Sequence, residues 1–145
     1  MPLDLAHLQT LTPDELDELF RQSPAGAIPD GEADGVVLLA SGTDLTGPLS
    51  KLIHLVGWKG KVFDRGRGEL LNRISPVGLE AVRAKVYKEA SWLDQKETIV
   101  LDYSKTSLVA QWIRDEIREV SPGVYLGLVF WERSKILHFA LDFNA

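Results

Sequence analysis

The sequence contains no cysteine, and this absence excludes several kinds of site at the outset. Disulfide bonds, thiolate nucleophiles and cysteine-ligated zinc are ruled out, and the composition fits a reducing compartment such as the cytoplasm. The three histidines, His7, His54 and His138, show none of the HxH or HxxxH spacings of a zinc site. The sequence therefore predicts no metal site and no cofactor, and we expect a cytoplasmic protein.

Long apolar runs and clusters of basic residues are also missing. No stretch approaches the roughly 18 apolar residues that a membrane span needs, and the first 20 residues lack the basic region and apolar run of a signal peptide. With a formal net charge of −5 and no block of Lys and Arg, nucleic acids and anionic membranes are poor partners. The expected partner is a small apolar or amphipathic molecule, and a homodimer is left open.

The length of 145 residues fits a single domain. We divide it into an N-terminal helical arm, residues 1–23, and a β-barrel, residues 24–145. In the arm, Thr12 is a helix N-cap, Pro13 occupies the first helical position, and Glu15 completes a capping box.

Short strands are predicted for most of the remaining chain. Segments with β-branched content or alternating polarity are 35–40, 59–64, 69–74, 81–93, 98–104, 123–131 and 135–143. A second helix is expected from Pro48 to about Val56, which includes His54, and His7 is assigned to an unstructured tail.

The segment 109–120 fits two structures. Apolar residues at helical spacing favour an amphipathic helix: Leu108, Val109, Trp112, Ile113, Ile117 and Val120. A strand would instead place Ile113, Asp115 and Ile117 on one face and Arg114, Glu116 and Arg118 on the other. The Ser-Pro-Gly that follows is a hairpin signal and the neighbouring segments are strands, so we predict that 109–120 is extended.

Several short motifs follow one another in a recognisable order. They are Gly31-Glu32-Ala33-Asp34-Gly35, Gly42, Trp58-Lys59-Gly60-Lys61-Val62-Phe63, Asp102-Tyr103, Asp115-Glu116-Ile117-Arg118 and Leu126-Gly127. In this order the chain from about Pro24 to Phe143 resembles the GXWXG family together with the domain of unknown function that usually follows it. Ala33 stands where the family's tryptophan is expected, which predicts either a wider interior at that point or a neighbouring ring, such as Trp58 or Trp92, that fills the space.

The resemblance implies a fold but no activity. It implies a small, mostly antiparallel β-barrel of the lipocalin-like sort, with an N-terminal helix outside it or across one end. The alternative is a cone-shaped α+β fold with a flat, open sheet. A small barrel has an interior wide enough for side chains or for one small ligand.

Asp115 is the leading candidate for a site in such an interior. It shares a strand face with Ile113 and Ile117, and isoleucine is usually buried. A carboxylate in an apolar lining needs a cation or donor from another strand. The candidates are Lys61, Arg73, Tyr103, Tyr125 and His138. The competing interpretation is an internal ion pair that only fixes the register.

Three further residues are candidate ligand contacts. Arg118 lies where the resemblance places an arginine, and its guanidinium could bind a ligand carboxylate with two hydrogen bonds. The alternative is that Arg118 belongs to a row of solvent-exposed ion pairs across neighbouring strands. His138 is a candidate general base or a satisfied histidine. Trp58, like Trp92, Trp112 and Trp131, fits either the core or an aromatic wall around a ligand.

Three functions remain open. The first is a binding protein for a small, mainly apolar molecule such as a fatty or aromatic acid. The second is an acid–base enzyme of decarboxylase, isomerase or hydrolase type acting through Asp115, Tyr103 or His138, which requires titratable groups that converge on one point. The third is an interaction module with a filled core.

Overall fold

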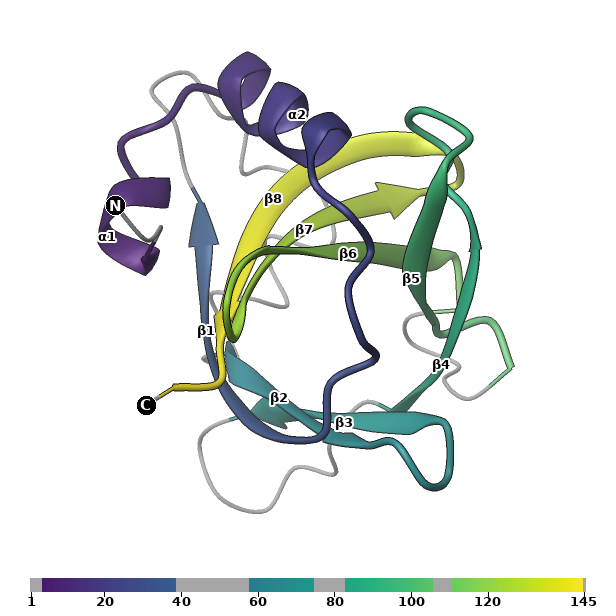
Figure 1. Cartoon of the computed structure of the whole chain (residues 1–145). Helices are drawn as coiled ribbons and strands as arrows, with labels where there is room; N and C mark the ends of the chain where they lie inside the picture. The colour runs from purple at the N-terminus through teal and green to yellow at the C-terminus, as the bar shows by residue number, and fades with distance from the viewer. Residues whose placement is uncertain (1–3, 39–57, 75–82, 106–110, 145) are drawn as a thin grey trace.

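The computed structural model describes residues 4–38, 58–74, 83–105 and 111–144 (Figure 1). The predicted second helix, 48–56, and the glycine at position 42 lie outside these residues. Neither helix in the described part of the chain is long and apolar enough to cross a membrane.

Two helices precede the strands. Helix α2 (Pro13–Gln22) begins as predicted: the Thr12 side chain accepts a hydrogen bond from the Glu15 backbone, and the Glu15 carboxylate accepts one from the Thr12 backbone. Helix α1 (Leu5–Leu8) was not predicted, and the assignment of His7 to an unstructured tail is wrong. The Asp4 carboxylate caps α1 by accepting a hydrogen bond from the His7 backbone.

The predicted antiparallel β-barrel is confirmed. Its strands are β1 (Gly31–Leu38), β2 (Trp58–Asp64), β3 (Glu69–Ile74), β4 (Arg83–Ala90), β5 (Glu97–Asp102), β6 (Ile113–Ser121), β7 (Val124–Trp131) and β8 (Ser134–Asp142). Each strand pairs with the next, and β1 pairs with β8 to close the barrel, so the flat, open sheet of the alternative fold is excluded (Figure 1).

The segment with two predicted structures forms strand β6. It pairs with β5 on one side and β7 on the other, so it is extended from Ile113 onward. Gln111 and Trp112 form a turn before it, and residues 109 and 110 lie outside the described chain. The hairpin to β7 turns at Pro122 and Gly123, where the positive φ of 75° at Gly123 suits glycine.

Strand β1 begins earlier than the sequence predicted, at Gly31 rather than Gly35. The first four residues of the strand, Gly31 to Asp34, include a glycine and two acidic residues, a composition typical of a loop. It pairs with β2 through a close approach, because a Cβ on Gly60 would lie 2.1 Å from the Ala33 carbonyl oxygen. Gly60 also has a φ of +143°, which side chains rarely adopt.

Alternation along the strands separates two apolar clusters. The interior cluster includes Ala33, Leu101, Ile113, Ile117 and Phe139. The outer cluster packs α1 and α2 against the outside of the barrel and includes Leu8, Leu16, Phe20, Leu126, Leu128 and Phe130. The helical arm therefore covers the outer face near β6, β7 and β8, outside the barrel as predicted (Figure 1).

Candidate functional site

A charged pair lies inside the apolar barrel. Lys61 on β2 and Asp115 on β6 are 3% and 4% exposed, and the Lys61 Nζ lies 3.4 Å from Asp115 Oδ2. Lys61 follows the irregular pairing of β2 with β3 between Trp58 and Gly60, and its Nζ also lies over the Phe139 ring. Burial of two ions is costly unless they pair, so this contact explains how both are tolerated.

Tyr103 connects the two charges. Its hydroxyl accepts a hydrogen bond of 2.8 Å from Lys61 Nζ and donates one of 3.4 Å to Asp115 Oδ2. Tyr103 follows the last residue of β5, where Asp102 fixes the backbone by accepting hydrogen bonds from the Ser104 backbone and hydroxyl. We call Lys61, Tyr103 and Asp115 the interior triad.

One oxygen of the triad stays without a partner. Asp115 Oδ1 is buried and accepts no hydrogen bond from any described residue, whereas the two contacts above both go to Oδ2. Buried carboxylate oxygens are normally hydrogen-bonded. Asp115 Oδ1 is therefore a buried acceptor without a hydrogen bond among the described residues.

The titration of the pair follows from its burial. Burial raises the pKa of Asp115, against the opposing effects of Lys61 and Tyr103. Burial lowers the pKa of Lys61, against the opposing effect of the Asp115 carboxylate. Both shifts favour the uncharged forms, and the pair carries no net charge whichever residue holds the proton.

A glycine makes room for the ring beneath Lys61. A Cβ on Gly127 of β7 would lie 2.2 Å from the Phe139 ring, so only glycine leaves the space that this ring occupies. Phe139 in turn faces the Lys61 ammonium at 5.3 Å from the ring centroid. The leucine-glycine motif noted in the sequence thus has a physical role beside the triad.

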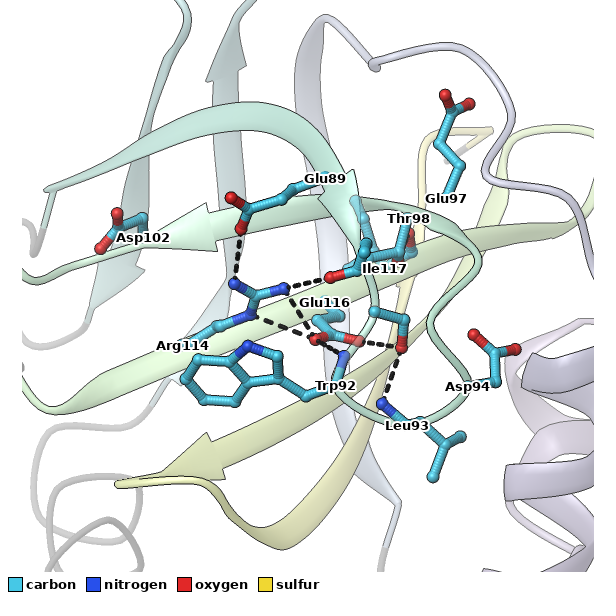
Figure 2. A network of polar contacts seen from close by, with 12 residues as sticks. Glu89, Trp92, Leu93, Asp94, Glu97, Thr98, Asp102, Arg114, Glu116 and Ile117 are labelled. Atoms are coloured by element: carbon cyan, nitrogen blue, oxygen red, sulfur yellow. Dashed lines mark hydrogen bonds and ion pairs between the residues drawn. The ribbon is translucent and has the colours of Figure 1, made fainter.

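The outer face of β6 carries a second polar network, centred on Glu116. This carboxylate is fully buried and accepts hydrogen bonds from the Ser91 hydroxyl and the Trp92 backbone. Arg114 donates to it at 3.1 Å and also reaches Glu89, while its guanidinium lies over the Trp92 ring (Figure 2). The network holds the loop between β4 and β5 against the barrel.

Arg118 continues this outer network. Its guanidinium donates two hydrogen bonds to the Asp94 carboxylate, at 2.7 and 2.8 Å. Three more go to the backbone carbonyls of Phe20, Lys96 and Glu97. Arg118 is 1% exposed, and the N–H groups of its guanidinium donate within the protein, so the side chain has no donor left for a ligand.

His138 binds the helical arm. Its Nε2 lies 2.7 Å from Oδ1 of Asp17 on α2, and Lys135 pairs with the other carboxylate oxygen. Burial lowers the pKa of His138, against the opposing effect of Asp17. Burial alone would raise the pKa of Asp17, but the hydrogen bonds from Lys135 and His138 lower it overall.

The sequence candidates thus fall into two groups. The structure brings Asp115 together with two of its five candidate partners, Lys61 and Tyr103. The candidate ligand contacts Arg118 and His138 do not join them, because their side chains on β6 and β8 point to the outer face and bind α2 and the loop between β4 and β5. The side chains of Trp58 and Arg73 lie outside what the structure describes.

The remaining candidates have other neighbours. The Tyr125 hydroxyl donates a hydrogen bond to the Ala27 carbonyl. Among the tryptophans whose side chains are described, Trp131 packs against the interior cluster. Trp112 is half exposed and Trp92 lies on the outer face. No three His, Asp or Glu side chains in the described ranges are grouped to hold a metal ion.

The partners of the charged side chains on the outer face carry no clear signal in the sequence. Asp17 on the polar side of α2 and Asp94 in a polar turn look like solvated charges in the sequence. The signal for Asp94 is that Arg114, Glu116 and Arg118 share one face of β6, so this face needs counterions from a segment that covers it.

Comparison with known proteins supports the barrel fold. No protein-family model matches the chain, and no curated protein matches it. Among solved structures, it is similar to a protein from Thermomonospora curvata, with a TM-score of 0.63 and 19% sequence identity over 93% of this chain and 89% of that chain. At this identity the likeness shows the fold alone, and the resemblance to the GXWXG family stays a prediction.

Proposed function

We propose that the barrel binds one small, mainly apolar or amphipathic molecule in its interior, and that the interior triad holds the polar end of this molecule. The observation that carries the proposal is Asp115 Oδ1, a buried acceptor without a hydrogen bond among the described residues. A cytoplasmic location, which the lack of cysteine favours, belongs to the same proposal.

An unpaired oxygen in the barrel interior lowers the stability of the protein. A buried acceptor left without a hydrogen bond destabilises a protein by about 1–3 kcal/mol, and more when it is charged. A ligand that donates to Oδ1 recovers this free energy on binding. The surrounding residues of the interior cluster, such as Leu101, Ile113 and Phe139, are apolar and match a mainly apolar ligand body.

The rival interpretation is a purely structural ion pair. A pair that evolved only to fix the strand register should use both carboxylate oxygens, as Glu116 does on the other face of the same strand. Asp115 uses one, and its contacts to Lys61 and Tyr103 are both 3.4 Å long. The triad is therefore less complete than its structural counterpart.

An acid–base enzyme is the second candidate, and one observation favours it. Three titratable groups converge, with Lys61 donating to Tyr103 and Tyr103 donating to Asp115. Such a chain can pass a proton toward a bound molecule if the pKa values lie close together, and burial shifts those of Lys61 and Asp115 toward each other. The substitution that tests it is Tyr103→Phe, which breaks the chain of hydrogen bonds.

The proposed function is tested on the full chain by native mass spectrometry after purification from its own cells. We expect a bound molecule at one per protein, or one-to-one binding of octan-1-ol or benzyl alcohol when these are added. Asp115→Asn should weaken the binding, while Asp64→Asn, at an exposed position, should not. Absence of any bound or added molecule would overturn the proposal.

A further inference from the structure

The contacts of the triad specify which ligand chemistry the interior accepts. Tyr103 and Lys61 both contact Asp115 Oδ2, so the remaining oxygen, Oδ1, is an acceptor that a ligand has to meet with a donor. Lys61 and Tyr103 themselves donate within the triad. A ligand group that only accepts hydrogen bonds would leave Oδ1 unmatched.

Charge imposes a second condition. In the described interior, the groups that face Asp115 are Lys61 from β2 and Tyr103 after β5, and Glu116, the next residue on β6, turns outward to Arg114. The pair of Lys61 and Asp115 is neutral as a unit. An anionic ligand beside it would therefore bring an uncompensated negative charge into an apolar barrel, which is strongly unfavourable.

We propose that the interior site selects uncharged ligands that carry a hydrogen-bond donor, with the donor given to Asp115 Oδ1, and that carboxylic acids enter only together with their proton. This inference rests on the proposed function and narrows its ligand class to alcohols, phenols and protonated weak acids. A protonated carboxyl group donates its O–H to Oδ1, so no second negative charge enters.

Three probes with the same number of carbon atoms separate these conditions. Octan-1-ol offers a donor, its isomer 1-methoxyheptane offers an acceptor but no donor, and octanoic acid offers a donor only in its protonated form. Dissociation constants are measured by calorimetry on the intact protein at pH 6, 7 and 8. We expect the alcohol to bind at least about tenfold tighter than the ether.

The pH series tests the charge condition. Carboxylic acids ionise with a pKa near that of Glu, about 4.3, so the protonated fraction falls about tenfold for each pH unit over this range. The affinity for octanoic acid should fall by about the same factor, while the affinities for the alcohol and the ether stay constant. An affinity for octanoic acid that does not change with pH would overturn the inference, because it would mean that Lys61 holds the anion.

Asp115→Asn shows whether Asp115 is responsible, since any apolar site prefers a protonated acid. The asparagine side chain can donate as well as accept, so the preference for the alcohol over the ether should fall to within about threefold. Asp64→Asn, which removes an exposed carboxylate, should keep the tenfold preference. If Asp115→Asn does not fold, the alcohol-to-ether ratio of the unmodified protein still decides the donor condition.

The outcomes separate the two proposals. If none of the three probes binds, the proposed function itself fails. If the alcohol and the ether bind equally to the unmodified protein, the interior binds ligands but the inferred donor rule is wrong.

Discussion

Strand β6 carries charged side chains on both faces, and the two faces are satisfied to different degrees. On the outer face Arg118 makes five hydrogen bonds, and both oxygens of Glu116 accept at least one. On the interior face Asp115 has two long contacts and one oxygen without a partner among the described residues. One strand thus places a completed network outside and an incomplete one inside.

This difference distinguishes charged residues that only stabilise the fold from charged residues that are candidates for binding a ligand. Burial does not distinguish the two kinds of charged group, because Arg118 and Asp115 are both almost fully buried. The completeness of their hydrogen bonding does distinguish them, since a purely structural network is stabilising only when its members are all paired. Substitutions on the two faces of β6 should therefore have different effects.

The largest effect is expected for Arg118→Met. The change removes the cation that pairs with the Asp94 carboxylate and one hydrogen bond from each of the carbonyls of Phe20, Lys96 and Glu97. We expect the free energy of unfolding to fall by about 5 kcal/mol, measured by urea denaturation. Arg67→Met, which removes an exposed arginine, is the control, and a loss below about 1 kcal/mol at Arg118 would contradict the structural role.

A smaller effect is expected inside the barrel. Asp115→Leu should cost about 3 kcal/mol, because Lys61 loses its counterion but can release its proton more easily than usual. Adding Lys61→Met should recover most of that loss, because an apolar pair replaces the whole ion pair. The two variants are compared by denaturation midpoints and slopes.

The same double substitution on the outer face provides the contrast. Asp94→Leu added to Arg118→Met should recover little, because Arg118 also donates to the backbone carbonyls of Phe20, Lys96 and Glu97, and neither apolar side chain replaces these three hydrogen bonds. Equal recovery on the two faces would show that the comparison between them has no energetic basis.

The contact between the arm and the barrel predicts a pH dependence. Burial lowers the pKa of His138, so the folded imidazole takes up its proton at a lower pH than in the unfolded chain, where the pKa is about 6.5. Between these two values the unfolded chain binds more protons, so the free energy of unfolding falls as the pH falls below about 6.5, by at most about 1.4 kcal/mol per unit. His138→Gln should remove this part of the slope in thermal melts from pH 5 to 8, and His7→Gln, at an exposed position, is the matched control.

The smallest effect concerns the turn between β7 and β8. Glu132 and Arg133 have positive φ angles of 49° and 83°, which asparagine and glycine adopt more easily. Glu132→Asn should therefore raise the free energy of unfolding by about 0.5 kcal/mol. Arg133→Gly should gain less, because the Arg133 guanidinium lies over the Trp92 ring and that contact is lost. A larger gain for Arg133→Gly than for Glu132→Asn, measured by urea denaturation, would show that this outermost contact does not stabilise the network.

Local signals in the sequence predicted the parts of the fold that depend on neighbouring residues. The capping box predicted α2, and alternation placed Asp115 with Ile113 and Ile117 on the interior face. Helix α1 was missed because four residues are too short for a periodic pattern, and the first residues of β1 were missed because Gly31 and its polar neighbours resemble a loop.

The partners on the outer face could not be predicted in the same way. Alternation shows that Arg118 and His138 share a face with other polar residues, but it does not show which segment covers that face. Their counterions, Asp94 and Asp17, come from a loop and a helix that no local pattern connects to β6 or β8. The sequence pattern therefore does not distinguish the structural contacts of Arg118 and His138 from contacts with a ligand.

The contact between Phe20 and Arg118 also has a consequence for synthesis of the chain. The two residues are 98 positions apart, and at about 5–20 residues per second the ribosome needs on the order of 5–20 s to pass from one to the other. During this time the apolar side of α2, with Leu16 and Phe20, has no barrel to cover it. The nascent arm is thus a segment that a chaperone can hold until β6, β7 and β8 have left the exit tunnel.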